Sequence, residues 1–221
     1  MKHRSARGFT LTEVLVTITI IIVLAVLAFS LSSRMINNAQ KAVCASNLRG
    51  IGNALQMYVS EKNGMLPGPL NTGQSALFNK DSRSLVTYIG PYLEEPRDNG
   101  AEPYLIANYG CPSLMKQIKE NTIQKPPVVY RLEDRQTKLL DNAVPPNDIS
   151  YPWGYAAGAI PKRIDQINPR SAGVVRMITE QNTTLGVGGW SNGGASSPAH
   201  GKQSMAMYWD FSVRAVTLNQ L

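Results

Sequence analysis

The sequence predicts an α+β protein. One long N-terminal helix, transmembrane in its first half, packs on a C-terminal antiparallel β-sheet domain with long loops. An apolar run from Val14 to Phe29 contains no charged residue, a one-sided apolar pattern continues to about residue 62, and strand-like segments fill the last third. The expected segments are a leader (1–8), a transmembrane helix (9–31), its amphipathic continuation (32–63) and an extracytoplasmic domain (64–221).

The apolar segment is long enough to cross a membrane. Residues 9–31 contain roughly the 20 predominantly apolar residues that a bilayer core of about 30 Å requires. Lys2, Arg4 and Arg7 precede the segment and favour a cytoplasmic N-terminus, while Arg34 and Lys41 on its far side oppose this weakly. The alternative is an uncleaved signal anchor that holds an unrelated domain at the membrane.

A Gly8-Phe9 junction separates the basic leader from the apolar run, and Glu13 lies at the start of that run. A secretory signal peptide is cut beyond its apolar core, whereas a cut at this junction would leave the apolar helix on the mature chain. An acid at the edge of such a helix is costly in lipid unless it is paired. Glu13 is therefore expected to have a partner.

This arrangement resembles the prepilin signal of type IV pilins and type II secretion pseudopilins, whose fold is the pilin "lollipop". The resemblance implies that a prepilin peptidase cuts after Gly8 and that the new amino group of Phe9 is methylated. It also implies that Glu13, the fifth residue of the mature chain, is an assembly residue that pairs with the N-terminal ammonium of a neighbouring subunit.

The helix is expected to continue beyond the membrane. No proline occurs between Ser32 and Lys62, and Asn63-Gly64 followed by Pro67-Gly68-Pro69 is a strong helix stop. Apolar residues recur at helical spacing and predict one face packed on a soluble domain, at Ile36, Ala39, Val43, Leu48, Ile51, Leu55 and Tyr58. Gly50 and Gly52 lie within this stretch and would permit a bend.

The rest of the chain predicts fewer elements. Residues 84–93 are typical of a short helix that ends near Gly90-Pro91, and Gly186 to Ser197 reads as a long surface loop. Ala172 to Thr179 is a β-branched run, and residues 204–209 and 212–218 read as a hairpin. The net charge of +7 includes the leader, and there is no basic cluster with interleaved aromatics, so we do not expect nucleic-acid binding.

The two cysteines leave two possibilities open. In an oxidising compartment Cys44 and Cys111 can form one disulfide that joins the middle segment to the helix. Alternatively they are two separate buried thiols with no special role.

Later landmarks resemble pseudopilin-like proteins of planctomycete type with an "H-x9-DG" C-terminal region. They are the segment from Cys44 to Arg49, the Cys111-Pro112-Ser113 turn, Ile149-Ser150-Tyr151, and His200 followed nine residues later by Asp210. Two positions depart from that pattern. Phe211 replaces the glycine, which predicts a longer turn than Asp-Gly would give, and Glu180 replaces an expected aspartate.

His200, Asp210 and Glu180 are the one group that suggests metal chemistry. Calcium is the alternative that the resemblance to major pseudopilins raises, but calcium prefers six to eight oxygen ligands. We therefore expect no cofactor, with Asp210 as a structural turn residue and His200 in a loop contact. No nucleophile elbow or phosphate loop is present, so we do not expect an enzyme.

The sequence thus favours a pseudopilin of a type II secretion-like system, located in the inner membrane with its C-terminal domain in the periplasm. Its expected partners are the prepilin peptidase, other (pseudo)pilin subunits, the inner-membrane assembly platform and the membrane. Two alternatives remain: a pilin of a type IV pilus, or a membrane-anchored carbohydrate- or cargo-binding protein in which Tyr151, Trp153 and Tyr155 would line the site.

Overall fold

The computed structural model of the 221-residue chain describes residues 10–79, 83–93, 103–106, 109–116, 128–132, 152–154, 160–167, 173, 176–180 and 198–217, without the side chains of 30–34 and 105. The chain divides into two compact units, Met1–Ala39 and Gln40–Leu221. The elements are α1 (Leu11–Glu61), β1 (Gly73–Ser75), β2 (Leu77–Phe78), α2 (Leu85–Ile89), η1 (Gly90–Tyr92), β3 (Tyr104–Leu105), α3 (Pro112–Met115), β4 (Val128–Leu132), η3 (Ile164–Gln166), β5 (Arg176–Glu180), β6 (Gln203–Tyr208) and β7 (Val213–Thr217).

The expected helix is one continuous α-helix of 51 residues, and neither Gly50 nor Gly52 interrupts it. Its end matches the Asn63-Gly64 stop. Asn63 and Gly64 both adopt positive φ, 54° and 83°, and the Gly64 amide donates to the Val59 carbonyl at 2.8 Å. This bond reaches back five residues, as in a Schellman motif, and satisfies a carbonyl that the helix end would otherwise leave unpaired.

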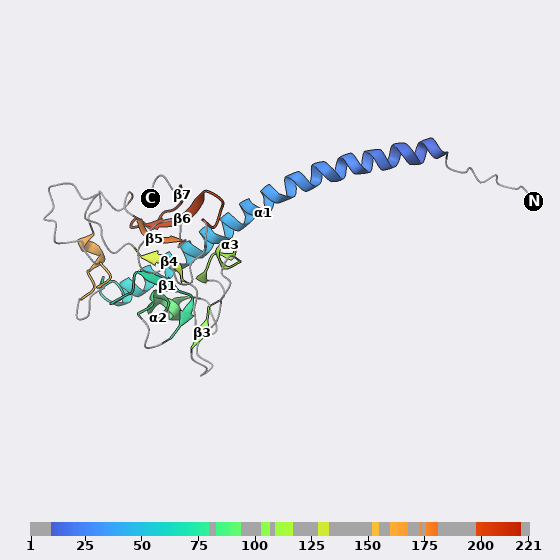
Figure 1. Cartoon of the computed structure of the whole chain (residues 1–221). Coiled ribbons are helices and arrows are strands. Elements are labelled where there is room, and N and C mark those ends of the chain that lie inside the picture. The colour runs from blue at the N-terminus through green and yellow to red at the C-terminus, as the bar shows by residue number, and fades with distance from the viewer. Residues whose placement is uncertain are drawn as a thin grey trace, which may run out of the picture. The chain divides into compact units, whose positions relative to one another are not determined.

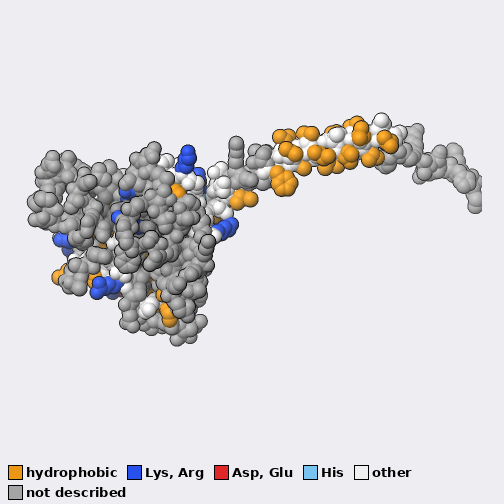
Figure 2. Space-filling model, viewed as in Figure 1, with side chains coloured by type: hydrophobic (Ala, Val, Ile, Leu, Met, Phe, Trp, Pro, Cys, Tyr) orange, Lys and Arg blue, Asp and Glu red, His pale blue; other side chains and the backbone are white. Residues whose placement is uncertain are grey.

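In the first unit, the apolar part of α1 has no buried side. Every residue from Leu11 to Phe29 is exposed, and Figure 2 shows apolar side chains along this stretch of the helix. Within the described residues, the segment from Leu11 to Phe29 is the one helical stretch that is long and apolar enough to cross a membrane. An apolar surface of this length is suited to lipid or to other apolar helices rather than to water.

In the second unit, α1 buries one face. Cys44, Leu48, Ile51, Leu55 and Val59 recur at spacings of three and four and are at most 6% exposed. They share one core cluster with residues of β4, β5 and β6. The predicted packed face begins at Ile36, but the observed one is shorter. Ile36 and Val43 are 56% and 45% exposed. The described part of α1 becomes buried only from Cys44 onward.

The domain contains a five-stranded antiparallel sheet in the order β1-β4-β5-β6-β7 and a separate antiparallel pair, β2-β3. The last three strands lie in succession in Figure 1. β6 and β7 form the predicted hairpin, with Met205 opposite Ala215. The predicted α+β class of the pilin type is confirmed.

Gly52 has a packing role rather than a flexible one. A Cβ atom at this position would lie 2.9 Å from the Met207 sulfur of β6. The missing side chain therefore lets the helix approach the sheet closely.

The predicted short helix over 84–93 is present as α2 followed by η1. Gln74 of β1 holds its start, because the Gln74 side-chain carbonyl accepts the Leu85 amide. Of the predicted run from Ala172 to Thr179, the described strand β5 begins at Arg176. The predicted loop 186–197 lies outside the described residues.

Candidate functional site

Gly8 and Phe9, the predicted cleavage and methylation positions, lie outside the described residues. The described chain begins at Thr10, immediately before α1, and the geometry of the motif can be followed from there.

Glu13 takes part in a reciprocal cap at the start of α1. Its Oε2 accepts bonds from the Thr10 amide and the Thr10 hydroxyl, both at 2.8 Å. In return the Glu13 amide donates to the Thr10 hydroxyl oxygen at 3.3 Å. This is the capping-box pattern, in which an N-cap Ser or Thr and a Glu three residues later satisfy each other's backbone amides.

Sequence reasoning missed this cap, although the Thr-x-x-Glu spacing signals it. The cap is a structural role of Glu13, separate from the assembly role that the resemblance implies. Within the described residues, Glu13 Oε1 makes no hydrogen bond, so a cap and a contact to an outside cation can coexist on one carboxylate.

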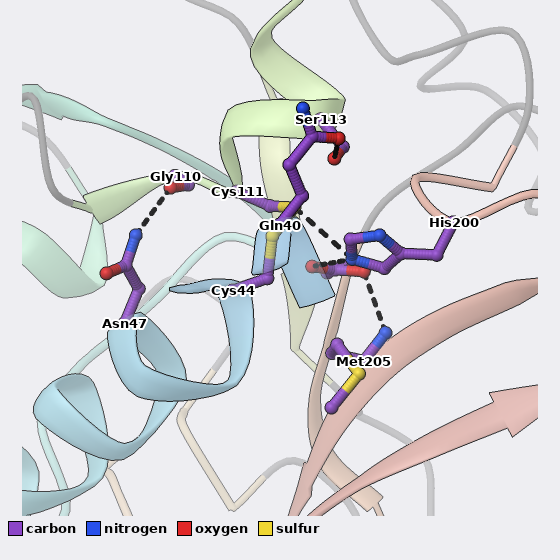
Figure 3. The surroundings of a disulfide bond; sticks show 9 residues. Gln40, Cys44, Asn47, Gly110, Cys111, Ser113, His200 and Met205 are labelled. Atoms are coloured by element: carbon purple, nitrogen blue, oxygen red, sulfur yellow. Dashed lines mark hydrogen bonds and ion pairs between the residues drawn. A yellow bond between two sulfur atoms is a disulfide. The ribbon is translucent and has the colours of Figure 1, made fainter. Parts of the chain in front are cut away.

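In the second unit, Cys44 and Cys111 are joined by a disulfide. The bond connects the buried face of α1 to the residue before α3 (Figure 3). Two hydrogen bonds support the same junction. Asn47 Nδ2 donates to the Gly110 carbonyl at 2.9 Å, and the Ser113 hydroxyl donates to Gln40 Oε1 at 2.6 Å.

Glu180 and His200 meet beside this disulfide. Glu180 Oε1 lies 3.8 Å from His200 Nε2, and the two side chains are 0% and 2% exposed. His200 Nε2 also lies 3.6 Å from Cys111 Sγ, as Figure 3 shows. Glu180 is the last residue of β5, and its Oε2 accepts the Met205 amide of β6 at 2.7 Å.

Asp210 has different partners. Its Oδ1 accepts the Ser212 amide and hydroxyl at 2.9 and 2.6 Å, and its Oδ2 lies 3.3 Å from an Arg214 nitrogen. The described group of possible metal ligands that contains Glu180 and His200 includes both cysteines and does not include Asp210. The structure therefore unites two members of the predicted trio and separates the third.

Asp210 acts within the β6–β7 turn. The connection spans residues 209–212 and is longer than an Asp-Gly turn, and Phe211 adopts a positive φ of 62°. Partial burial acts to raise the pKa of Asp210, but the Ser212 hydrogen bonds and the Arg214 charge lower it overall.

Of the three aromatic residues considered for carbohydrate, Tyr151 and Tyr155 lie outside the described residues. Trp153 is 1% exposed and stacks on Trp209 with ring centroids 5.2 Å apart. This ring packs in the core and does not present a face to solvent.

The comparison with protein families identifies the N-terminal signal. Residues 3–29 match the family described as the prokaryotic N-terminal methylation motif. No curated protein and no solved structure gives a significant match to the chain. The chain therefore carries a prepilin-type N-terminal motif on a single apolar helix that fits a membrane anchor, consistent with a type IV pilin-like protein.

Proposed function

We propose that the chain is a structural filament subunit, a pseudopilin of a type II secretion-like system. A prepilin peptidase removes residues 1–8, Phe9 is methylated, and the subunit assembles through its helix at an inner-membrane platform. The observation that carries the proposal is the methylation motif at residues 3–29, which includes a helical stretch exposed on every side from Leu11 to Phe29.

The orientation follows from charge. Lys2, Arg4 and Arg7 precede the helix and favour a cytoplasmic N-terminus, which leaves the domain in the periplasm. A disulfide between Cys44 and Cys111 is suited to that oxidising compartment.

Glu13 is proposed to pair with the N-terminal ammonium of a neighbouring subunit. A carboxylate in an apolar helix needs a partner, and Thr10 engages only Oε2 of Glu13 in the described residues. The neighbour's ammonium would contact the remaining oxygen and set the stagger between subunits.

Two substitutions at Glu13 test assembly. Glu13→Gln keeps a carbonyl that can accept the Thr10 bonds but removes the charge, whereas Glu13→Val removes both. We expect both variants to insert in the membrane and both to reduce recovery in sheared or pelleted filaments by about tenfold, equivalent to about 1.4 kcal/mol per subunit contact.

The two variants separate the roles of the carboxylate. Normal assembly of Glu13→Gln with failure of Glu13→Val would restrict Glu13 to helix capping. Normal assembly of both would make the helix a simple anchor and overturn the proposal.

A pilin of a surface type IV pilus is the rival within the same architecture, because the same motif precedes both kinds of subunit. Deletion of the gene, with complementation by the full chain, distinguishes the two. Loss of secreted proteins with normal surface filaments supports the pseudopilin, and loss of surface pili with normal secretion supports the pilin.

A further inference from the structure

Four metal-binding side chains converge in the domain, apart from the N-terminal motif and the β6–β7 turn. They are Cys44, Cys111, Glu180 and His200, and one ligand atom from each lies within 4.8 Å of all the others. We propose that, once the disulfide is reduced, these four residues bind one zinc ion.

The spacing suits a tetrahedral site. Zinc bonds of 2.0–2.3 Å in tetrahedral geometry place neighbouring ligand atoms about 3.3–3.8 Å apart. The Cys111 Sγ to His200 Nε2 distance is 3.6 Å, and the His200 Nε2 to Glu180 Oε1 distance is 3.8 Å. To complete the tetrahedron, the two sulfurs must separate from their bond to each other, and the remaining ligand atoms, which lie within 4.8 Å of one another, must close to this spacing.

Among the described residues, one oxygen of the Glu180 carboxylate accepts a hydrogen bond and the other does not. Its Oε2 accepts the Met205 amide at 2.7 Å. Its Oε1 is buried without a hydrogen-bond partner among the described residues. A buried polar atom with no partner costs free energy, and this atom is the one that faces His200. The Met205 bond would orient the carboxylate, as outer hydrogen bonds do for metal ligands.

The ligand set selects the metal class. Two thiolates, one imidazole and one carboxylate suit zinc, whereas calcium and magnesium prefer sites made of oxygen. The predicted calcium alternative at His200, Asp210 and Glu180 lacks a shared location, because Asp210 bonds within its own turn.

The chemistry makes zinc and the disulfide mutually exclusive. A dithiol reductant opens the bond by exchange: it is oxidised to its own disulfide, and Cys44 and Cys111 gain two electrons and two protons. Zinc then displaces both thiol protons and binds two thiolates, neutral His200 and ionised Glu180. A small-molecule disulfide would reverse the exchange: it is reduced to its dithiol, the Cys44–Cys111 bond re-forms, and zinc is released. The disulfide and the zinc ion would each link the helix to Cys111.

The test uses the full chain in detergent micelles. The chain is reduced, freed of reductant and metal under inert gas, and titrated with Zn²⁺, or with Co²⁺ as a coloured probe of thiolate ligands. We expect one metal per reduced chain, a thiolate-to-cobalt charge-transfer band, and no binding by the oxidised chain.

Matched variants locate the site. Glu180→Gln and His200→Ala should each weaken zinc binding at least tenfold, whereas Glu61→Gln, at the exposed end of α1, should leave it unchanged. Circular dichroism of each oxidised variant checks that it folds. A reduced chain that loses structure and regains it with one equivalent of zinc also supports the site.

Four results would overturn the proposal. The first three are no zinc binding by the reduced chain, equal binding by the oxidised chain, and unchanged affinity in both folded variants, Glu180→Gln and His200→Ala. The fourth is a complex of two chains per metal, which would mean that the thiols bridge molecules.

Discussion

The two halves of α1 have the same secondary structure and opposite surroundings. From Leu11 to Phe29 every residue is exposed although most are apolar, whereas from Cys44 onward one narrow face is buried in the domain core. Most of the stability of a helix in a protein comes from packing of its apolar face. The second half is therefore stabilised within its own chain, whereas the first half depends on lipid or on other subunits.

For the half of α1 that packs within the chain, removal of the disulfide should cause the largest loss of unfolding free energy. Cys44 and Cys111 are 67 residues apart, and closing a loop of that length constrains the unfolded chain by about 4 kcal/mol. The double variant Cys44→Ser, Cys111→Ser should lose about that much free energy of unfolding. Denaturant unfolding of the full chain in detergent, followed by tryptophan fluorescence with a chelator present, measures the loss.

Reduced wild-type chain under the same conditions is the control and should match the double variant. A loss below about 0.5 kcal/mol, within the range of ordinary surface changes, would show that the cross-link contributes little to the domain.

A pair of truncations compares buried and exposed positions on α1. Leu48 is 0% exposed and Val43 is 45% exposed. Leu48→Ala should cost about 3 kcal/mol, because it removes buried methyl groups and leaves a cavity. Val43→Ala should change the free energy of unfolding by less than about 0.5 kcal/mol. The same unfolding assay measures both variants. Equal losses of unfolding free energy at the two positions would contradict a buried face that begins at Cys44.

Apart from the Val43→Ala control, the smallest effect belongs to the β6–β7 turn. Asp210→Ala should cost about 1 kcal/mol, the usual net contribution of a lost hydrogen-bond partner, since the side chain is 36% exposed and its Arg214 pair is largely screened. The pKa of Asp210 is lowered from 3.8 in the folded chain. Its contribution is therefore fully present above about pH 4 and is lost as the pH falls through the folded pKa.

Thermal melts of wild type and Asp210→Ala across pH 2–7 test this behaviour, and the two curves should converge in acid. Calcium and chelator should leave both melting temperatures unchanged. A rise with calcium that vanishes in Asp210→Ala would instead make the turn a metal site.

Local patterns predicted much of the fold. The continuous helix, α2 and the β6–β7 hairpin depend on periodicity and nearby stop signals, which a single sequence contains. The pairing of β1 with β4 has no such local signal. β1 is the three-residue segment Gly73–Ser75, and its partner follows more than 50 residues later, so neither propensity nor alternation signals it.

The candidate site residues also fall into a group that local sequence predicts and a group that only the fold brings together. Gly8, Phe9 and Glu13 lie within one six-residue stretch of the sequence, so the sequence alone could group them. Glu180 and His200 could be named as candidates, but their position beside the disulfide depends on long-range packing, since Cys111 and His200 are 89 residues apart. Residue type and the resemblance group Asp210 with them, but in the structure Asp210 bonds to Ser212 within its own turn.

The central claim is that the apolar half of α1 remains on a mature chain that begins at Phe9. The most direct measurement is the intact mass and N-terminal sequence of chain extracted from the membranes of cells with an active prepilin peptidase. We predict loss of Met1 to Gly8 with one added methyl group on Phe9. Gly8→Val should abolish the cut, because a branched side chain crowds the junction, and Ala6→Val should leave it intact. Recovery of wild-type chain with its leader, or of a chain cut beyond Phe29, would contradict the account.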